Sequence, residues 1–179
     1  MQKLCLATIF IFTSAAFGQA PAFPQGTWTL QTYGAYTAGK HFYEEQLPSV
    51  GFGFGYYVFN NASINAELSG YHVTQTGEDA EAINLQLLLR HHFIDAGKLT
   101  IFADVGPGAF YATEQVPIGG TNFNITFRSG LGATYHLREN MYLFGGARYF
   151  HLSNAALEGR ENNPSINGLE GYVGLMWRL

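Results

Sequence analysis

A histidine and a serine two residues apart, His151 and Ser153, are the residue types that a nucleophilic ester hydrolase uses. A hydroxyl becomes an effective nucleophile when an imidazole lies close enough to take its proton. In a β-strand, residues two apart point to the same face, so the two side chains would lie side by side. A histidine and a serine that are merely solvated at a membrane surface would leave the same pattern. The pair therefore predicts an acyl-transfer site only where its surroundings support one.

The residues around this pair follow the alternating pattern of β-strands, and no segment shows apolar residues at helical spacing. Eight strands are predicted, at residues 26–36, 48–59, 62–74, 82–94, 99–111, 121–137, 141–153 and 167–179. Three short connections, rich in Asn, Gly and Asp as tight turns are, alternate with four longer polar ones. This layout is typical of outer-membrane β-barrels, which have an even number of strands.

Each predicted strand has one apolar face that contains no Lys, Arg, Asp or Glu. The charged strand residues lie on the opposite face: Glu67, Arg90, Asp104, Arg128, Arg148, Glu170 and Arg178. A soluble, lipocalin-like barrel is the alternative, but it would carry long charged faces toward water. We therefore predict an all-β protein, an eight-stranded antiparallel outer-membrane β-barrel with its apolar face outward and a filled polar interior. The inward arginines and carboxylates should pair, because a buried charge is tolerated only with a partner.

The composition excludes several other classes of protein. Of 179 residues, 47% are hydrophobic and 12% are charged, whereas an ordinary soluble domain has about 25% charged residues. A net charge of −4 without a basic run argues against a nucleic-acid partner. The one cysteine, Cys5, excludes an internal disulfide, and the six histidines are scattered. No metal and no other cofactor is predicted, and the acidic residues Glu78, Asp79 and Glu81 are interpreted as a solvated loop.

The first residues have the pattern of a secretion signal. Lys3 precedes an apolar run from Leu4 to Phe12, and small residues follow. The run is shorter than the roughly 20 residues of a membrane-spanning helix. We predict a signal peptide over residues 1–18, with cleavage after Ala20 as the alternative, and a single barrel domain over residues 19–179.

The segment 148–170 resembles the signature of the PagL-type lipid A 3-O-deacylases, the acyloxyacyl hydrolase family. The resemblance rests on these residues: His151, Leu152, Ser153, Asn154, Ala155, Asn163, Pro164 and Asn167. Members of this family are eight-stranded outer-membrane barrels that hydrolyse the ester at position 3 of lipid A with a Ser-His-Glu triad on the outer surface. The resemblance implies that His151 is the general base and Ser153 the nucleophile, with Asn154 and Asn163 at the oxyanion hole.

The third member of the triad is where this sequence departs from the family. Alignment of the asparagines puts Asn167 where the family has Glu. An asparagine can accept the imidazole N–H, but it stabilises an imidazolium less than a carboxylate does. Glu170 is the nearest acid downstream, yet the alternation turns it into the barrel, and Glu158 and Glu161 have no spacing that commits them to the site. We take Asn167 as the orienting residue.

The strand that ends at Ser153 runs outward if the short turns and both termini lie in the periplasm. The His151/Ser153 end then reaches the outer leaflet, and we expect it to be the only part of the outer face that departs from the apolar pattern. The sequence thus predicts a serine esterase of the bacterial outer membrane that acts on lipid A of lipopolysaccharide. The alternatives are a structural or adhesive barrel without catalysis, and a phospholipase at the same interface. Whether the barrel forms a homodimer stays open.

Overall fold

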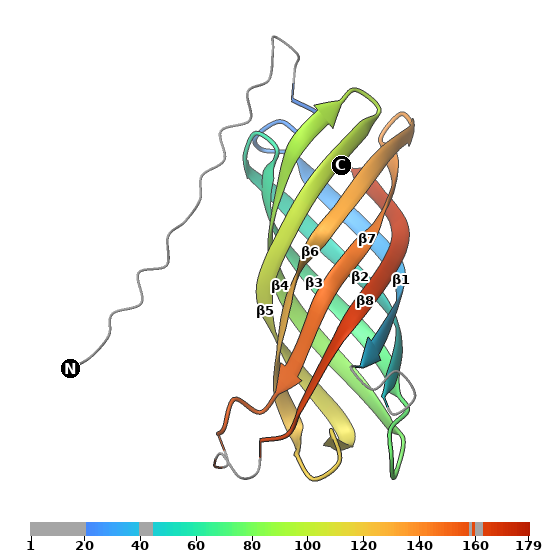
Figure 1. Ribbon diagram of the computed structural model, residues 1–179. Helices are drawn as coiled ribbons and strands as arrows, with labels where there is room; N and C mark the ends of the chain where they lie inside the picture. Colours follow the sequence, from blue (N-terminus) through green and yellow to red (C-terminus); the bar gives the residue numbers. More distant parts are fainter. Residues whose placement is uncertain (1–20, 40–44, 158, 160–162) are drawn as a thin grey trace, which may run out of the picture.

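The chain folds into a closed β-barrel in a computed structural model that describes residues 21–39, 45–157, 159 and 163–179. Its strands are β1 (Trp28–Gly39), β2 (Gln46–Phe59), β3 (Ala62–Val73), β4 (Ala80–Ala96), β5 (Leu99–Val116), β6 (Thr121–Arg138), β7 (Met141–Ser153) and β8 (Ser165–Arg178). Neighbours in sequence pair antiparallel, and β1 closes the barrel by pairing with β8 (Figure 1). The predicted eight-stranded barrel is confirmed. The predicted signal peptide lies outside the described residues.

The two ends of the barrel differ in their connections. Tight turns join β2 to β3, β4 to β5 and β6 to β7 at the end that also holds the C-terminus, and the longer connections lie at the opposite end (Figure 1). Asn61, Gly97 and Glu139 in these turns have φ angles of 60°, 75° and 42°. Hairpin turns that match the twist of the strands need such positive φ angles. Among the described residues, no helix has the length and hydropathy to cross a membrane.

Five strands (β1, β2, β4, β5 and β8) are longer than predicted at the end with the longer connections, the loop end, and two of them by three residues or more. β1 continues to Gly39, and β5 continues from Tyr111 to Val116 over residues that were expected to form a loop. Ala112 and Val116 are buried in an apolar cluster inside the barrel. The ladder with β6 is irregular between Tyr111 and Val116, so the alternation breaks there. Burial of these inward side chains extends the strand where the sequence pattern is interrupted.

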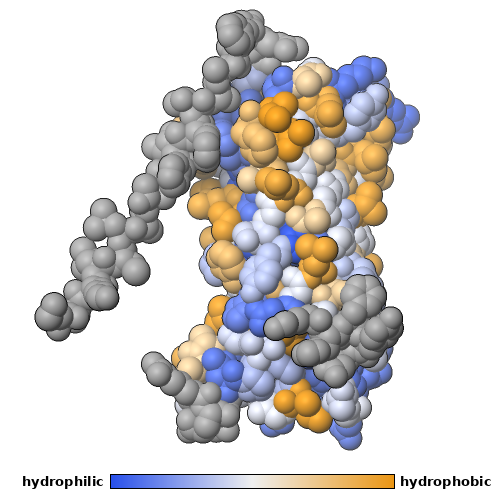
Figure 2. All heavy atoms as spheres, in the orientation of Figure 1, coloured by the Kyte–Doolittle hydropathy of each residue, from blue (hydrophilic) through white to orange (hydrophobic). Residues whose placement is uncertain are grey.

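The outer wall is apolar along its middle, as the predicted membrane-facing surface requires. On β4, Leu85, Leu87 and Leu89 are 51–59% exposed, while the alternating Gln86 and Leu88 are fully buried. Figure 2 shows hydrophobic side chains spread over the wall and hydrophilic ones gathered toward the two ends. This distribution fits a barrel whose middle is surrounded by lipid and whose ends lie in water.

A layer of ion pairs occupies the middle of the barrel interior. Its members are Glu67, Arg90, Asp104, Arg128, Arg148 and Glu170, each with a fully buried side chain. Arg148 connects them, because its guanidinium lies 2.7 Å from Asp104 Oδ2, 3.4 Å from Glu67 Oε2 and 3.5 Å from Glu170 Oε1. The predicted pairing of the inward charges is confirmed, and their signs balance.

Apolar clusters lie on both sides of this charged layer. The cluster at the loop end includes Phe110, Phe150 and Ile166. At the turn end, the ring of Phe23 stacks on Tyr57 with centroids 4.9 Å apart and is fully buried. The segment before β1 thus closes the turn end, while the loop end carries the residues described next.

Candidate functional site

The site is built by the last residues of β7 and the first residues of β8. The antiparallel register pairs His151 with Asn167 and Ser153 with Ser165. Alternation along β7 puts Tyr149, His151 and Ser153 on the outer face, next to Ser165 and Asn167 on β8. The strand ladder therefore brings together side chains from two parts of the sequence at the loop end of the wall.

His151 is the centre of a hydrogen-bonded chain. Its Nε2 lies 3.1 Å from Ser153 Oγ, and its Nδ1 lies 2.8 Å from Asn167 Oδ1. Because an amide oxygen only accepts hydrogen bonds, it pairs with a protonated Nδ1 and leaves the Nε2 lone pair facing Ser153. This is the tautomer that a general base needs in order to take a proton from a serine hydroxyl. The structure thus places three of the predicted site residues in one chain.

The Asn167 side chain is held from two sides. The Tyr149 hydroxyl donates to Asn167 Oδ1 at 2.5 Å, and Asn167 Nδ2 donates to Ser165 Oγ at 3.1 Å. Sequence reasoning missed both partners. Tyr149 precedes His151 by two residues and Ser165 precedes Asn167 by two, and this same-face spacing is the signal that could have found them.

The turn after β7 brings a backbone donor to Ser153. Asn154 Oδ1 accepts the N–H of Ala156 at 2.9 Å, which shapes the turn, and the N–H of Ala155 points at Ser153 Oγ from 3.4 Å. Ala155 and Ala156 have φ angles of 54° and 59°, a left-handed conformation that costs energy for residues other than glycine. Ser153 is only 7% exposed, so the predicted nucleophile is sheltered and does not stand free on the lipid-facing wall.

The other predicted residues lie around or away from this chain. Asn163 is half-buried just before β8, and its Oδ1 has no hydrogen-bond partner among the described residues. Glu170 points into the barrel, as the alternation predicted, and lies 3.2 Å from Arg128 Nη2. It is therefore occupied by the interior ion pairs. Glu158 and Glu161 lie outside the described residues.

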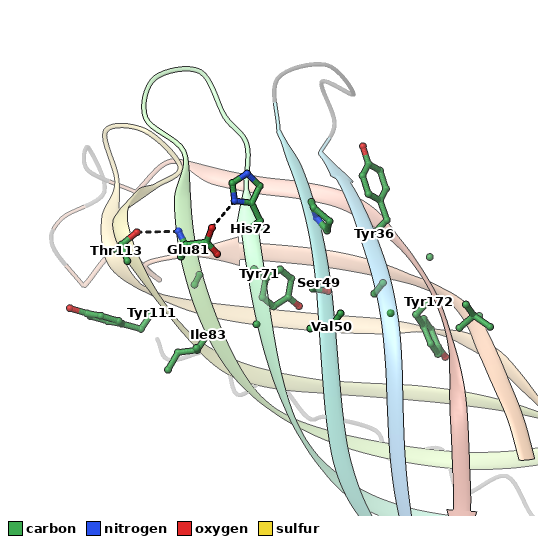
Figure 3. A pocket seen from close by; sticks show the side chains of 18 residues that line it. Tyr36, Ser49, Val50, Tyr71, His72, Glu81, Ile83, Tyr111, Thr113 and Tyr172 are labelled. Carbon is green, nitrogen blue, oxygen red and sulfur yellow. Dashed lines mark hydrogen bonds and ion pairs between the residues drawn. The ribbon is translucent and has the colours of Figure 1, made fainter. Parts of the chain in front are cut away.

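A second polar group on the outer face contradicts the expectation that only the His151/Ser153 end is polar. His72 and Glu81 are neighbours across β3 and β4, with Nδ1 2.8 Å from Oε1, and the Glu81 N–H donates to Thr113 Oγ1 at 3.1 Å (Figure 3). Glu81 belongs to β4 and not to the preceding loop, because the β3–β4 ladder continues to the pair of Val73 with Ala80. His72, Glu81 and Thr113 line a pocket together with Ser49 and Val50 (Figure 3).

No group of three or more His, Cys, Asp or Glu residues in the described ranges is arranged to hold a metal ion. The site at the β7–β8 end instead consists of a hydroxyl, an imidazole and an amide in hydrogen-bond contact. Such a set can activate the hydroxyl for attack on an ester carbonyl.

Several solved outer-membrane barrels have a similar fold. Neisserial surface protein A has a TM-score of 0.64 at 15% identity, covering 87% of this chain and 98% of that one. The N-terminal β-barrel domain of OprF from Pseudomonas aeruginosa has a TM-score of 0.61 at 15% identity, covering 87% and 98%. The outer membrane enzyme PagL has a TM-score of 0.56 at 16% identity, covering 82% and 97%. These likenesses show the fold.

A search of curated protein sequences found no significant match. The model of the lipid A 3-O-deacylase family PagL, however, matches residues 26–176, which extend from two residues before β1 to two residues before the end of β8. The barrel and this match place the protein in the bacterial outer membrane. Since the match covers most of the sequence and includes all the site residues described above, the chain belongs to the PagL lipid A 3-O-deacylase family.

Proposed function

We propose that this protein is an outer-membrane serine esterase that hydrolyses the 3-O-linked acyl chain of lipid A. Family membership supports the substrate. The observation that carries the mechanism is the chain from Ser153 Oγ through the His151 ring to Asn167 Oδ1, with separations of 3.1 and 2.8 Å. Ser153 is the nucleophile, His151 the general base and Asn167 the residue that orients the imidazole.

The surroundings of the site suit a substrate that is embedded in a membrane. Phe127 on β6 is the cross-strand neighbour of His151 and is 40% exposed. Leu169, the next outward residue after Asn167 on β8, is 63% exposed. An acyl chain can lie against these apolar side chains while its ester reaches the polar chain at the end of the wall. With the turns in the periplasm, this end of the wall lies in the outer leaflet.

The reaction follows the double-displacement course of serine esterases. His151 Nε2 takes the Ser153 proton while Oγ bonds to the ester carbonyl carbon, and the carbonyl becomes a tetrahedral oxyanion. The bond from this carbon to the sugar oxygen then breaks, and His151 returns the proton to that oxygen. Water, deprotonated by His151, attacks the acyl-enzyme and releases the fatty acid, which restores Ser153 and the neutral imidazole.

The oxyanion is stabilised by donors next to the nucleophile. The Ala155 N–H is directed at Ser153 Oγ from 3.4 Å, and the Asn154 side chain accepts the Ala156 N–H within the turn that presents it. The family resemblance also assigns Asn154 and Asn163 to this role, and Asn163 would offer its amide N–H group. A donor aimed at a developing oxyanion contributes roughly 3 kcal/mol to catalysis.

Mass spectrometry of lipid A tests the proposal. Purified wild-type protein should remove one acyl chain and release one fatty acid, whereas Ser153→Ala and His151→Gln should lose this activity by at least about 10³-fold. Ser129→Ala is a matched control, because Ser129 lies on the outer face of β6 opposite Tyr149 and outside the proposed triad. Equal deacylation by the wild type and Ser153→Ala would refute the serine mechanism.

The same variants separate the alternative functions. Release of fatty acid from phosphatidylethanolamine but not from lipid A, lost in Ser153→Ala, would make the protein a phospholipase with the same machinery. Intact lipid A and intact phospholipid with every variant would leave a barrel without esterase activity. The proposed function requires lipid A to be the cleaved substrate.

A further inference from the structure

We propose that Tyr149 and Ser165 are positioning residues that hold the Asn167 carboxamide with its oxygen toward His151 and thereby select the tautomer of the catalytic imidazole. The inference rests on the proposed function, because that function makes His151 the general base. An asparagine at this position can turn its NH₂ group toward His151, whereas a carboxylate presents an oxygen in either orientation.

A carboxylate presents an acceptor oxygen in either orientation, but a carboxamide has one oxygen and one NH₂ group. With Asn167 Oδ1 toward His151, Nδ1 carries the proton and Nε2 can accept the proton of Ser153. If the amide were turned over, its NH₂ would donate to Nδ1, and the ring proton would move to Nε2. Nε2–H would then point at Ser153 Oγ, and the histidine could not act as a base. The orientation of one amide thus decides whether the site is active.

The two hydroxyls that contact the amide are placed to favour the active orientation. Tyr149 OH lies 2.5 Å from Asn167 Oδ1, the same oxygen that accepts from His151. Ser165 Oγ lies 3.1 Å from Asn167 Nδ2 on the other side. In the inverted amide, Tyr149 would have to accept a hydrogen bond from NH₂, and Ser165 would have to donate one to the oxygen.

A phenol and an alkyl hydroxyl differ in the direction that they prefer. The lone pairs of a phenol oxygen are delocalised into its ring, so a tyrosine hydroxyl donates better and accepts worse than a serine hydroxyl. The better donor faces the amide oxygen, and the better acceptor faces the amide nitrogen. Exchange of the two hydroxyl types would favour the inactive orientation, so their order in the structure is a specific feature of this site.

Backbone pairing fixes this arrangement. Ser165 is the register partner of Ser153, and Asn167 is the partner of His151. Tyr149 is paired with Leu169 and reaches Asn167 on the diagonal, a distance that long side chains span in an antiparallel ladder. All five outer-face side chains are therefore set by the same two strands.

Kinetics in two backgrounds test the proposal. In the wild type, Tyr149→Phe should lower kcat about tenfold with little change in KM, which corresponds to an amide that is inverted in roughly nine of ten molecules. Ser165→Ala should act in the same direction. In an Asn167→Asp background, both substitutions should change kcat less than about twofold, because a carboxylate cannot be inverted. Tyr135→Phe, on the outer face of β6 at the turn end, is the control and should leave kcat unchanged.

A spectroscopic measurement reads the tautomer without activity. Nitrogen-15 spectra of histidine-labelled protein in micelles, assigned with His151→Gln, should show the Nδ1–H form of His151 in the wild type. Tyr149→Phe should move both ring nitrogens toward the Nε2–H form. Loss of activity in Ser153→Ala with this tautomer pattern intact supports both proposals. An active Ser153→Ala overturns the proposed function, and the spectra then still test whether Tyr149 and Ser165 set the orientation of the Asn167 amide.

Two results would overturn the positioning role. One is an equal loss of kcat for Tyr149→Phe in the Asn167 and Asn167→Asp backgrounds, which would mean that the phenol acts without the amide. The other is an unchanged His151 spectrum in both Tyr149→Phe and Ser165→Ala. Tyr149 is 45% exposed on the wall and the substitution keeps its ring, so the variant is expected to fold. A difference in electrophoretic mobility between unheated and heated samples checks that the barrel is folded.

Discussion

His151 and Asn167 are direct partners in the β7–β8 ladder, and His151 Nδ1 lies 2.8 Å from Asn167 Oδ1. The contact orients the ring as the carboxylate of a serine-hydrolase triad does, but it brings no negative charge. In the proposed mechanism, the imidazolium that forms when Ser153 gives up its proton therefore faces an amide dipole at Nδ1. A neutral third member preserves the geometry and gives up part of the electrostatic stabilisation.

Asn167→Glu places a carboxylate at position 167 and should raise kcat/KM roughly tenfold, because a carboxylate stabilises the imidazolium. It also favours the protonated ring in the free enzyme, so the acid limb of the pH profile should move to higher pH. Asn167→Leu should lower kcat by about 10²-fold or more. Rates on lipid A between pH 5 and 9 measure both effects. An unchanged pH profile in Asn167→Glu would show that residue 167 does not act on His151.

Glu170→Gln should lower the stability of the barrel and leave kcat unchanged, whereas the Asn167 variants should change the kinetics. It removes a carboxylate that lies 3.2 Å from Arg128 and 3.5 Å from Arg148, both fully buried. Loss of one member of a buried charge network costs about 3–5 kcal/mol. Urea unfolding in micelles should therefore show a less stable barrel, while kcat of the folded fraction stays at the wild-type value. A large loss of kcat without a loss of stability would instead give Glu170 the orienting role.

The regular part of this molecule could be predicted from sequence because, along each strand of a closed barrel, side chains point alternately into the barrel and outward. The inward position of Glu170 and the outward position of His151 follow from counting by two along strands that bury one face. The prediction failed where regularity ends: β5 runs on to Val116 through an irregular ladder, and the outward pair of His72 and Glu81 depends on how far β3 and β4 extend.

The site could be predicted only in part. His151 and Ser153 lie on one strand, so their spacing is local. The contact of Tyr149 with Asn167 joins residues 18 apart in sequence and depends on the register of β7 with β8. The Ala155 N–H is also hidden from side-chain patterns, because a backbone donor leaves no residue-type signal.

The turn after Ser153 can be tested through its two left-handed residues. Ala156 has a φ of 59°, so Ala156→Gly should stabilise the protein by up to about 1 kcal/mol, while Ala156→Val should destabilise it. Asn154→Ala removes the acceptor of the Ala156 N–H and should lower kcat about tenfold or more by misplacing the Ala155 donor. Equal kcat for the wild type and Asn154→Ala would exclude this turn from catalysis.

A charged residue on the lipid-facing wall should lower the stability of the barrel more, the closer it lies to the middle of the membrane. Leu87 lies near the middle of β4 and is 51% exposed, so Leu87→Arg should lower stability by about 2–4 kcal/mol. Ile118, in the turn between β5 and β6, is 56% exposed at the loop end, and Ile118→Arg should cost less than about 1 kcal/mol. Folding into lipid vesicles at increasing urea measures both. Equal costs at the two positions would contradict the proposed depth of the barrel in the membrane.

Phe23 is expected to hold the turn end of the barrel closed. Its ring is fully buried, stacks on Tyr57, and packs 4.6 Å from the centroid of His92, and its N–H donates to Asn61 Oδ1 at 3.0 Å. Phe23→Ala should cost about 3–5 kcal/mol in urea unfolding, because it leaves a cavity among rings that cannot collapse within a closed barrel. Phe59→Ala, at the same end but 68% exposed on the outer face, should cost far less. Since the hydrogen-bonded chain from Ser153 to Asn167 lies at the opposite end, kcat of folded Phe23→Ala should equal that of the wild type. A parallel loss of kcat would contradict this independence of the two ends.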